Sequence, residues 1–164
     1  MRTKITLLGF FFFSIIGFAQ ISTMRMNELK IGMRPSEILK LLGNKPVAIA
    51  DESETNITLK GIDYIIEIRS GYLSKTENDT YLSSISTTSK NIKTLSGIGV
   101  GSSLDNLWYV YATKYNVLLN KSNNNYREFK IDDNENGVIL TFYLSNEIVT
   151  KIELSTYNPE ECTL

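Results

Sequence analysis

The chain has 164 residues, of which 17 are Lys or Arg and 18 are Asp or Glu, so its net charge at pH 7 is −1. Charges of both signs are interspersed, which argues against a nucleic-acid-binding protein with a concentrated basic patch. Histidine is absent, which excludes Ser-His-Asp and Cys-His catalytic sites and zinc sites built on histidine.

Residues 1–19 have the pattern of a secretory signal peptide. Arg2 and Lys4 precede an apolar run that ends at Ile16, and small residues follow at Gly17 and Ala19. The run is shorter than the roughly 20 residues that a membrane-spanning helix needs. We therefore expect cleavage before Gln20, and a periplasmic or secreted protein with no stable membrane anchor.

A single cysteine, Cys162, lies in the expected C-terminal tail, residues 158–164. An exported chain usually has the opportunity to form disulfides, but one cysteine cannot form an internal bridge. The stability of the fold must therefore come from its hydrophobic core.

The first expected module covers residues 20–91. Pro35 suits the first turn of a helix and Gly43 suits its C-terminal stop, which predicts a helix of two turns between them. Alternating apolar residues predict a strand at 62–68, and a second strand is expected at 81–88 after a polar loop.

The second expected module covers residues 92–157. Ser102 is a candidate cap for a helix over 103–114, and strands are expected at 126–131, 138–144 and 148–154. Strand alternation places a set of side chains toward the core: Val138, Leu140, Phe142, Leu144, Ile148, Thr150, Ile152 and Leu154. Helical spacing predicts one apolar face that packs against the sheet and leaves Tyr109 exposed. The residues of this face are Leu104, Leu107, Trp108, Tyr111 and Tyr115.

Two sequence echoes suggest a duplication. Ile31-Gly32-Met33 is repeated by Ile98-Gly99-Val100, and the segment 61–68 is repeated by 137–144. Self-similarity of this kind indicates a repeated structural unit. We therefore predict an α+β fold of two tandem helix-then-antiparallel-meander modules, forming one continuous sheet with helices on one face.

The phrase Leu29-Lys30-Ile31-Gly32-Met33 through Leu39-Lys40-Leu41-Leu42-Gly43-Asn44-Lys45-Pro46 resembles the opening of the small α/β domain of the BamE/SmpA outer-membrane assembly lipoproteins. Two such modules in an exported chain are similar to the β-lactamase inhibitor protein (BLIP) architecture, whose members grip partner proteins on a concave sheet surface. The resemblance implies a fold and a protein-binding role. It implies no site residue and no activity.

Three candidate sites were weighed against simpler explanations. Residues 132–137 match the first half of a calcium loop, but Tyr143 stands where the final Glu ligand is required, so a polar hairpin loop explains the same residues. The glycine-rich segment 97–103 precedes a helix without the context of a dinucleotide site. Glu67, Glu128 and Glu153 are acids that a carboxylate-dependent enzyme could use, although nothing in the sequence places two of them across one cleft.

The sequence favours a non-enzymatic protein-binding module of the inhibitor, immunity or envelope scaffold type. Its partner would be another envelope or secreted protein, and no cofactor or metal is expected. Binding would use an exposed sheet face with aromatic and charged side chains. Tyr and Arg are the favoured candidates, because both are enriched at interface centres. The candidate residues are Tyr126, Lys130, Tyr143, Lys151, Glu67 and Arg69. The alternative is a carboxylate-dependent envelope hydrolase.

Overall fold

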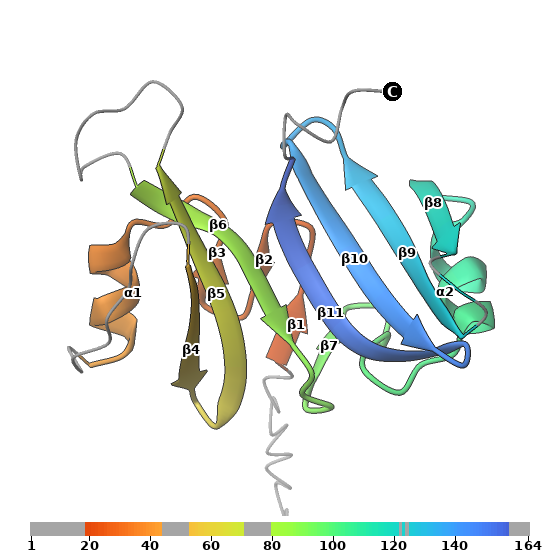
Figure 1. Ribbon diagram of the computed structural model, residues 1–164, viewed down its shortest axis with the longest axis horizontal. Helices are drawn as coiled ribbons and strands as arrows, with labels where there is room; N and C mark the ends of the chain where they lie inside the picture. The colour runs from red at the N-terminus through yellow and green to blue at the C-terminus, as the bar shows by residue number, and fades with distance from the viewer. Residues whose placement is uncertain (1–18, 44–52, 71–79, 122, 124, 158–164) are drawn as a thin grey trace, which may run out of the picture.

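A computed structural model describes residues 19–43, 53–70, 80–121, 123 and 125–157. Of these residues 55% lie in strands and 13% in helices, and the strands form sheets of 4 and 7 strands (Figure 1). The predicted α+β class with two tandem helix-then-antiparallel-meander modules is therefore wrong. The fold is mostly β, and it contains a second sheet that the sequence pattern did not indicate.

The smaller sheet explains much of this difference. Its strands follow the order β3-β2-β1-β7, in which β1 and β7 are parallel and the other pairs antiparallel. They are β1 (Ala19–Ile21), β2 (Arg25–Met26), β3 (Leu29–Lys30) and β7 (Ile92–Thr94). Strands of two or three residues are too short to show alternation, and the segment that holds β7 reads as a linker in sequence.

The larger sheet is antiparallel throughout, with the order β4-β5-β6-β11-β10-β9-β8. Its strands are β4 (Glu54–Leu59), β5 (Ile62–Ser70), β6 (Thr80–Thr87), β8 (Asn116–Lys121), β9 (Tyr126–Asp133), β10 (Val138–Ser145) and β11 (Ile148–Thr156). The five predicted strands are confirmed as β5, β6, β9, β10 and β11, whereas both edge strands were missed.

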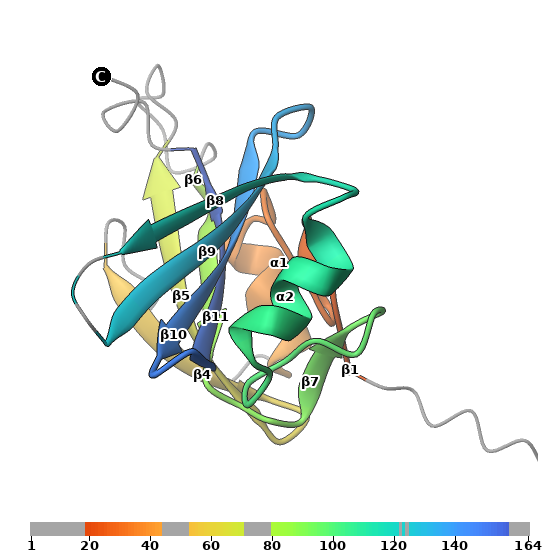
Figure 2. The ribbon, with the colours of Figure 1, turned by 90° about the vertical axis from the view of Figure 1, so that its right-hand side faces the viewer.

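Both predicted helices are confirmed, as α1 (Pro35–Leu41) and α2 (Leu104–Tyr111). The cap of α2 is Ser103 rather than Ser102, because the amide of Asn106 donates to the Ser103 side chain. The helices and the smaller sheet lie on one side of the larger sheet (Figure 2). One continuous hydrophobic cluster fills the space between them, and its largest fully buried side chains are Tyr64, Phe129 and Phe142.

The predicted burial of the α2 aromatics is confirmed only for Tyr111. Tyr111 is 6% exposed and stacks on Phe142, whereas Trp108 is 37% exposed and Tyr115 is 49% exposed. Trp108 is only partly buried, and its ring packs edge-to-face against the fully buried Phe129 at 5.2 Å between centroids. Tyr115 lies beyond the end of the helix, so helical spacing does not place its side chain. Tyr109 is 89% exposed, as expected.

A local arrangement before each helix occurs twice. Gly32 and Gly101 both have positive φ, 87° and 95°, a conformation that favours glycine. The Gly32 amide donates to the carbonyl of Leu82, and the Gly101 amide donates to the carbonyl of Val149, so each pre-helix turn docks on a strand of the larger sheet. The structural equivalent of Gly32 is therefore Gly101, not Gly99 as the sequence echo suggests.

Each docking point is followed by a β-bulge. Ser83 of β6 and Thr150 of β11 are skipped in the pairing with their neighbouring strands, and a bulge of this kind changes which side chains face the core. Val149 is consequently buried while Ile148 is 42% exposed, and Thr150 is also exposed. The predicted core positions of Ile148 and Thr150 are wrong, because strict alternation does not continue through a bulge.

Several sequence expectations lie outside the described residues. They are the signal peptide up to residue 18, most of the polar loop at 71–79, and the C-terminal tail with Cys162. These expectations stay predictions. Within the described ranges, no helix combines the length and the apolar character that crossing a membrane requires.

Candidate functional site

The candidate site is the face of the larger sheet that points away from the helices, here called the outer face. Successive side chains of a strand point to opposite sides of a sheet, so the residues that alternate with the core positions of β5, β6, β9, β10 and β11 share this face. Apart from Ile65 and Ile139, its central side chains are polar or carry a polar group: Glu67, Arg69, Ser84, Ser86, Glu128, Lys130, Thr141, Tyr143, Lys151, Glu153 and Ser155.

Three ion pairs on this face each join residues two positions apart on one strand. Arg69 Nε lies 2.9 Å from Glu67 Oε1 on β5. Lys130 Nζ lies 3.1 Å from Glu128 Oε2 on β9, and Lys151 Nζ lies 2.7 Å from Glu153 Oε2 on β11. Residues i and i+2 project from the same face of a strand, so the partners meet without any change in the backbone.

The strand register arranges two of these pairs as a charge checkerboard around β10. Tyr143 lies between Lys151 on β11 and Glu128 on β9. Thr141, one step along the face, lies between Glu153 and Lys130. The sign of the charge therefore alternates along β9, along β11, and across β10 from one of these strands to the other.

Tyr143 occupies the centre of the checkerboard. The ammonium group of Lys151 lies over its ring, 4.6 Å from the centroid, which is within cation–π range. The side chains of Lys130 and Glu153 are 23% and 21% exposed, although the described helices and the smaller sheet lie on the opposite side of the larger sheet (Figure 2). The neighbouring side chains therefore shield the charged groups, and the aromatic ring supplies an apolar surface among them.

A hollow of about 150 Å³, here called the fork hollow, opens where β6 and β11 separate. The two strands pair only from Thr87 opposite Ile152 to Ser84 opposite Ser155. Beyond that point β6 continues to pair with β5, and β11 with β10. The bulge residue Ser83 stands at the fork, and its hydroxyl donates to the carbonyl of Glu67 at 3.0 Å.

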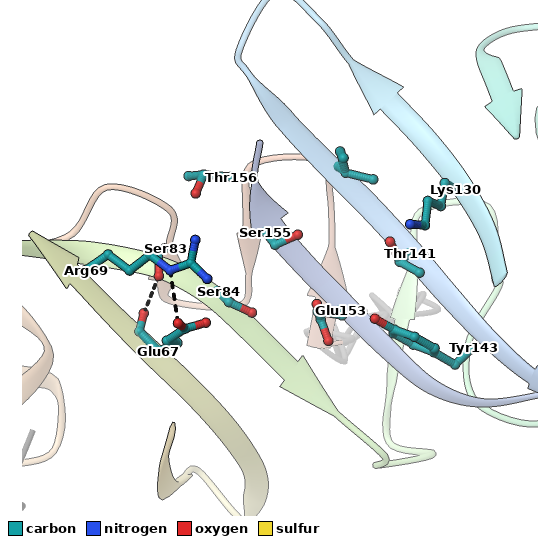
Figure 3. A pocket seen from close by; sticks show the side chains of 11 residues that line it. Glu67, Arg69, Ser83, Ser84, Lys130, Thr141, Tyr143, Glu153, Ser155 and Thr156 are labelled. Atoms are coloured by element: carbon teal, nitrogen blue, oxygen red, sulfur yellow. Dashed lines mark hydrogen bonds and ion pairs between the residues drawn. The ribbon is translucent and has the colours of Figure 1, made fainter. Parts of the chain in front are cut away.

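Strands on both sides of the fork line the fork hollow: β5 and β6 on one side, and β9, β10 and β11 on the other. Figure 3 shows Glu67 and Arg69 on one side, Ser155 and Glu153 in the middle, and the side chains from β9 and β10 on the other side. The lining residues are Glu67, Arg69, Ser83, Ser84, Lys130, Ile139, Thr141, Tyr143, Glu153, Ser155 and Thr156. A second hollow, of about 320 Å³, has Ile65, Ser86 and Lys151 in its lining and shares no lining residue with the fork hollow.

The six residues predicted for binding all lie on the outer face. Glu67, Arg69, Lys130 and Tyr143 line the fork hollow, and Lys151 lies beside it over the Tyr143 ring. The structure does not bring Tyr126 into this group. It pairs with Ser145, one step beyond Glu128 toward the end of the sheet, and is 55% exposed.

The sequence reasoning missed the partners that complete the pattern. Glu128 and Glu153 were considered only as possible catalytic acids, and Thr141 was not considered. The signal was present in the sequence, because each acid stands two residues from a lysine on a predicted strand. Alternation alone would have placed each pair on one face.

Among the described residues, every buried side-chain nitrogen or oxygen has a hydrogen-bond partner. No group of three or more His, Cys, Asp or Glu in these ranges is placed to hold a metal ion. The partial calcium motif is a hairpin turn in which Asp133 accepts hydrogen bonds from Asn136, as the simpler explanation predicts.

Comparison with known proteins gives no relative. No protein-family model, no curated protein and no solved structure matches this chain.

Proposed function

We propose that the chain is an exported, non-enzymatic protein-binding module whose binding surface is the outer face. The observation that carries the proposal is the charge checkerboard around Tyr143. It combines an aromatic ring with paired charges of both signs on the side of the sheet that faces away from the helices. Aromatic residues are enriched at the centre of protein interfaces.

The checkerboard suggests the chemistry of the partner. A complementary surface presents an acidic group to Lys130 and to Lys151, a basic group to Glu128 and to Glu153, and an apolar side chain to Tyr143. Because like charges brought face to face are costly, an alternating pattern rejects a surface of one sign and fixes the register of the correct one. We infer a partner protein that lays a loop or strand pair of mixed charge across the outer face.

The resemblance to BLIP-type modules rests on short sequence motifs alone, because the two tandem modules that it implies are not formed. It stays a prediction, as do the exported location and the inhibitor, immunity or scaffold role. The expected partner is accordingly an envelope or secreted protein.

The alternative, a carboxylate-dependent envelope hydrolase, has one observation in its favour, since Glu67 and Glu153 both line the fork hollow. The hollow has a volume of about 150 Å³, whereas sites for small ligands usually occupy about 300–1,000 Å³. Both acids also form ion pairs, with Arg69 and Lys151. Binding is therefore the better-supported function of the outer face.

The experiment is capture of envelope and secreted proteins on the immobilised chain, with Tyr143→Ala as the test variant. Tyr109→Ala is the matched control, because Tyr109 is 89% exposed on helix α2, on the other side of the sheet. We expect a partner that binds the wild type and Tyr109→Ala but not Tyr143→Ala. Hydrogen exchange of the complex should then protect β9, β10 and β11. Equal capture by both variants, or protection confined to the helical side, would contradict the proposal.

A further inference from the structure

We propose that a third hollow, at the end of the larger sheet where β9 turns into β10, binds a neutral sugar. This corner hollow has a volume of about 680 Å³, within the range of roughly 300–1,000 Å³ typical of small-ligand sites. It is lined by Thr23, Thr113, Lys114, Tyr115, Asn116, Asp132, Asp133, Asn134, Glu135 and Asn136. It shares no lining residue with the fork hollow.

The lining selects the class of ligand. Apart from the Tyr115 ring, every lining side chain is polar, which disfavours an apolar ligand. Three carboxylates face a single ammonium group, that of Lys114, which disfavours a phosphate or another anion. A sugar matches both features, because its hydroxyls pair with carboxylate and amide groups while its C–H face packs on an aromatic ring.

The aromatic wall is held in place from below. Tyr115 is 49% exposed, and its ring packs edge-on against Tyr111 with 5.9 Å between the ring centroids. Tyr111 is 6% exposed, and its hydroxyl donates to Thr94 Oγ1 at 2.9 Å. The exposed ring is thus a fixed platform rather than a loose surface side chain.

Hydrogen bonds hold the polar wall as well. Asp133 Oδ2 accepts from Thr23 Oγ1 at 2.6 Å and from Asn136 Nδ2 at 2.9 Å. The Tyr157 hydroxyl donates to Asn134 Oδ1 at 2.6 Å. Groups that are already ordered lose little freedom when a ligand binds.

Other groups remain available to the ligand. Among the described residues, the side chains of Asp132 and Lys114 form no hydrogen bond or ion pair. A carboxylate that accepts from sugar hydroxyls and an ammonium that donates to them are therefore present without the loss of an existing contact. The site is independent of the protein-binding proposal, and either can fail alone.

The test is an NMR titration of the chain with maltotriose, cellotriose and triacetylchitotriose at millimolar concentrations. We expect at least one of these sugars to give saturable shifts centred on residues 113–116 and 132–136. Tyr115→Ala should weaken its binding by about tenfold, as expected for loss of an aromatic platform. Asp132→Ala should also weaken binding without disturbing the fold, since the Asp132 side chain has no hydrogen bond or ion pair to lose within the described part of the chain.

Two controls make the result decisive. Tyr115→Phe keeps the ring and should retain binding, and Tyr109→Ala removes an exposed tyrosine outside the hollow and should change nothing. The proposal is overturned if none of the three sugars gives saturable shifts. It is also overturned if binding is equally strong in Tyr115→Ala, or is lost equally in Tyr109→Ala.

Discussion

Tyr64 ties the start of the described chain to the larger sheet, and its burial makes a measurable prediction about pH. The side chain of Asn27, in the turn between β2 and β3, donates from Nδ2 to the Tyr64 hydroxyl at 2.7 Å. Burial of the phenol raises the pKa of Tyr64 from 10.0 to about 12, although the Asn27 hydrogen bond acts in the opposite direction. The unfolded chain therefore loses this proton at a lower pH than the folded chain.

The sign and size of the effect follow from linkage. Below about pH 10 the phenol is protonated in both states, and its contribution to stability is fully present. As pH rises from about 10 to 12, ionisation favours the unfolded state, and the free energy of unfolding falls by about 2–3 kcal/mol. Tyr64→Phe removes this dependence and costs about 1 kcal/mol at neutral pH through the lost hydrogen bond.

The assay is urea unfolding of the wild type and Tyr64→Phe between neutral pH and pH 12. The wild type should have the larger free energy of unfolding at neutral pH. The plots of this free energy against pH should cross near pH 11, roughly where the stability lost through ionisation of Tyr64 equals the contribution of its hydrogen bond. Above that pH, Tyr64→Phe should be the more stable protein. Tyr109→Phe is the control and should track the wild type at every pH. Parallel curves for the wild type and Tyr64→Phe would refute the reasoning about this buried phenol.

Three further predictions concern the bulge, a pre-helix turn and the hairpin turn. Ser83→Ala should lower the free energy of unfolding by about 1 kcal/mol, because the carbonyl of Glu67 loses a hydrogen bond at a buried site; unchanged chemical denaturation would contradict this. Gly101→Ala should cost about 1–2 kcal/mol in the same assay, because φ is +95° there, and a neutral effect would exclude backbone strain. The hydrogen bond from Thr23 lowers the pKa of Asp133 in the folded chain. Ionised Asp133 therefore stabilises the fold above the pKa that this group has in the unfolded chain, and the stabilisation is lost as the pH falls through the lower pKa of the folded chain. Thr23→Val should raise the Asp133 pKa in an NMR titration; an unmoved pKa would rule out this cause.

The helices and longer strands could be predicted because their signals are local. Pro35 and Gly43 mark the start and the stop of α1, and β5 shows its alternation over nine residues. The pairing of β1 with β7 depends instead on contacts between short segments distant in sequence. No local pattern encodes such a pairing, and the missing sheet changed the fold class.

The same distinction applies to the candidate site. Alternation was enough to place Lys130, Tyr143 and Lys151 on one face. It could not show that the strands fork beyond Ser84, nor that the bulge at Thr150 turns Ile148 outward, because both depend on pairing between strands. The sequence therefore predicted part of the face, but neither the acidic partners Glu128 and Glu153 nor the shape of the hollow.

In the proposed function, the pattern of charge on the outer face, and not merely its composition, recognises a partner protein. The most direct measurement is the affinity of the captured partner for a double swap, Glu128→Lys with Lys130→Glu, which keeps the net charge and can preserve the ion pair on β9 while inverting the signs on one side of Tyr143. We predict a loss of affinity of at least about tenfold at low salt, which shrinks as salt screens the charges. A swapped protein that folds normally and binds as tightly as the wild type would contradict the account.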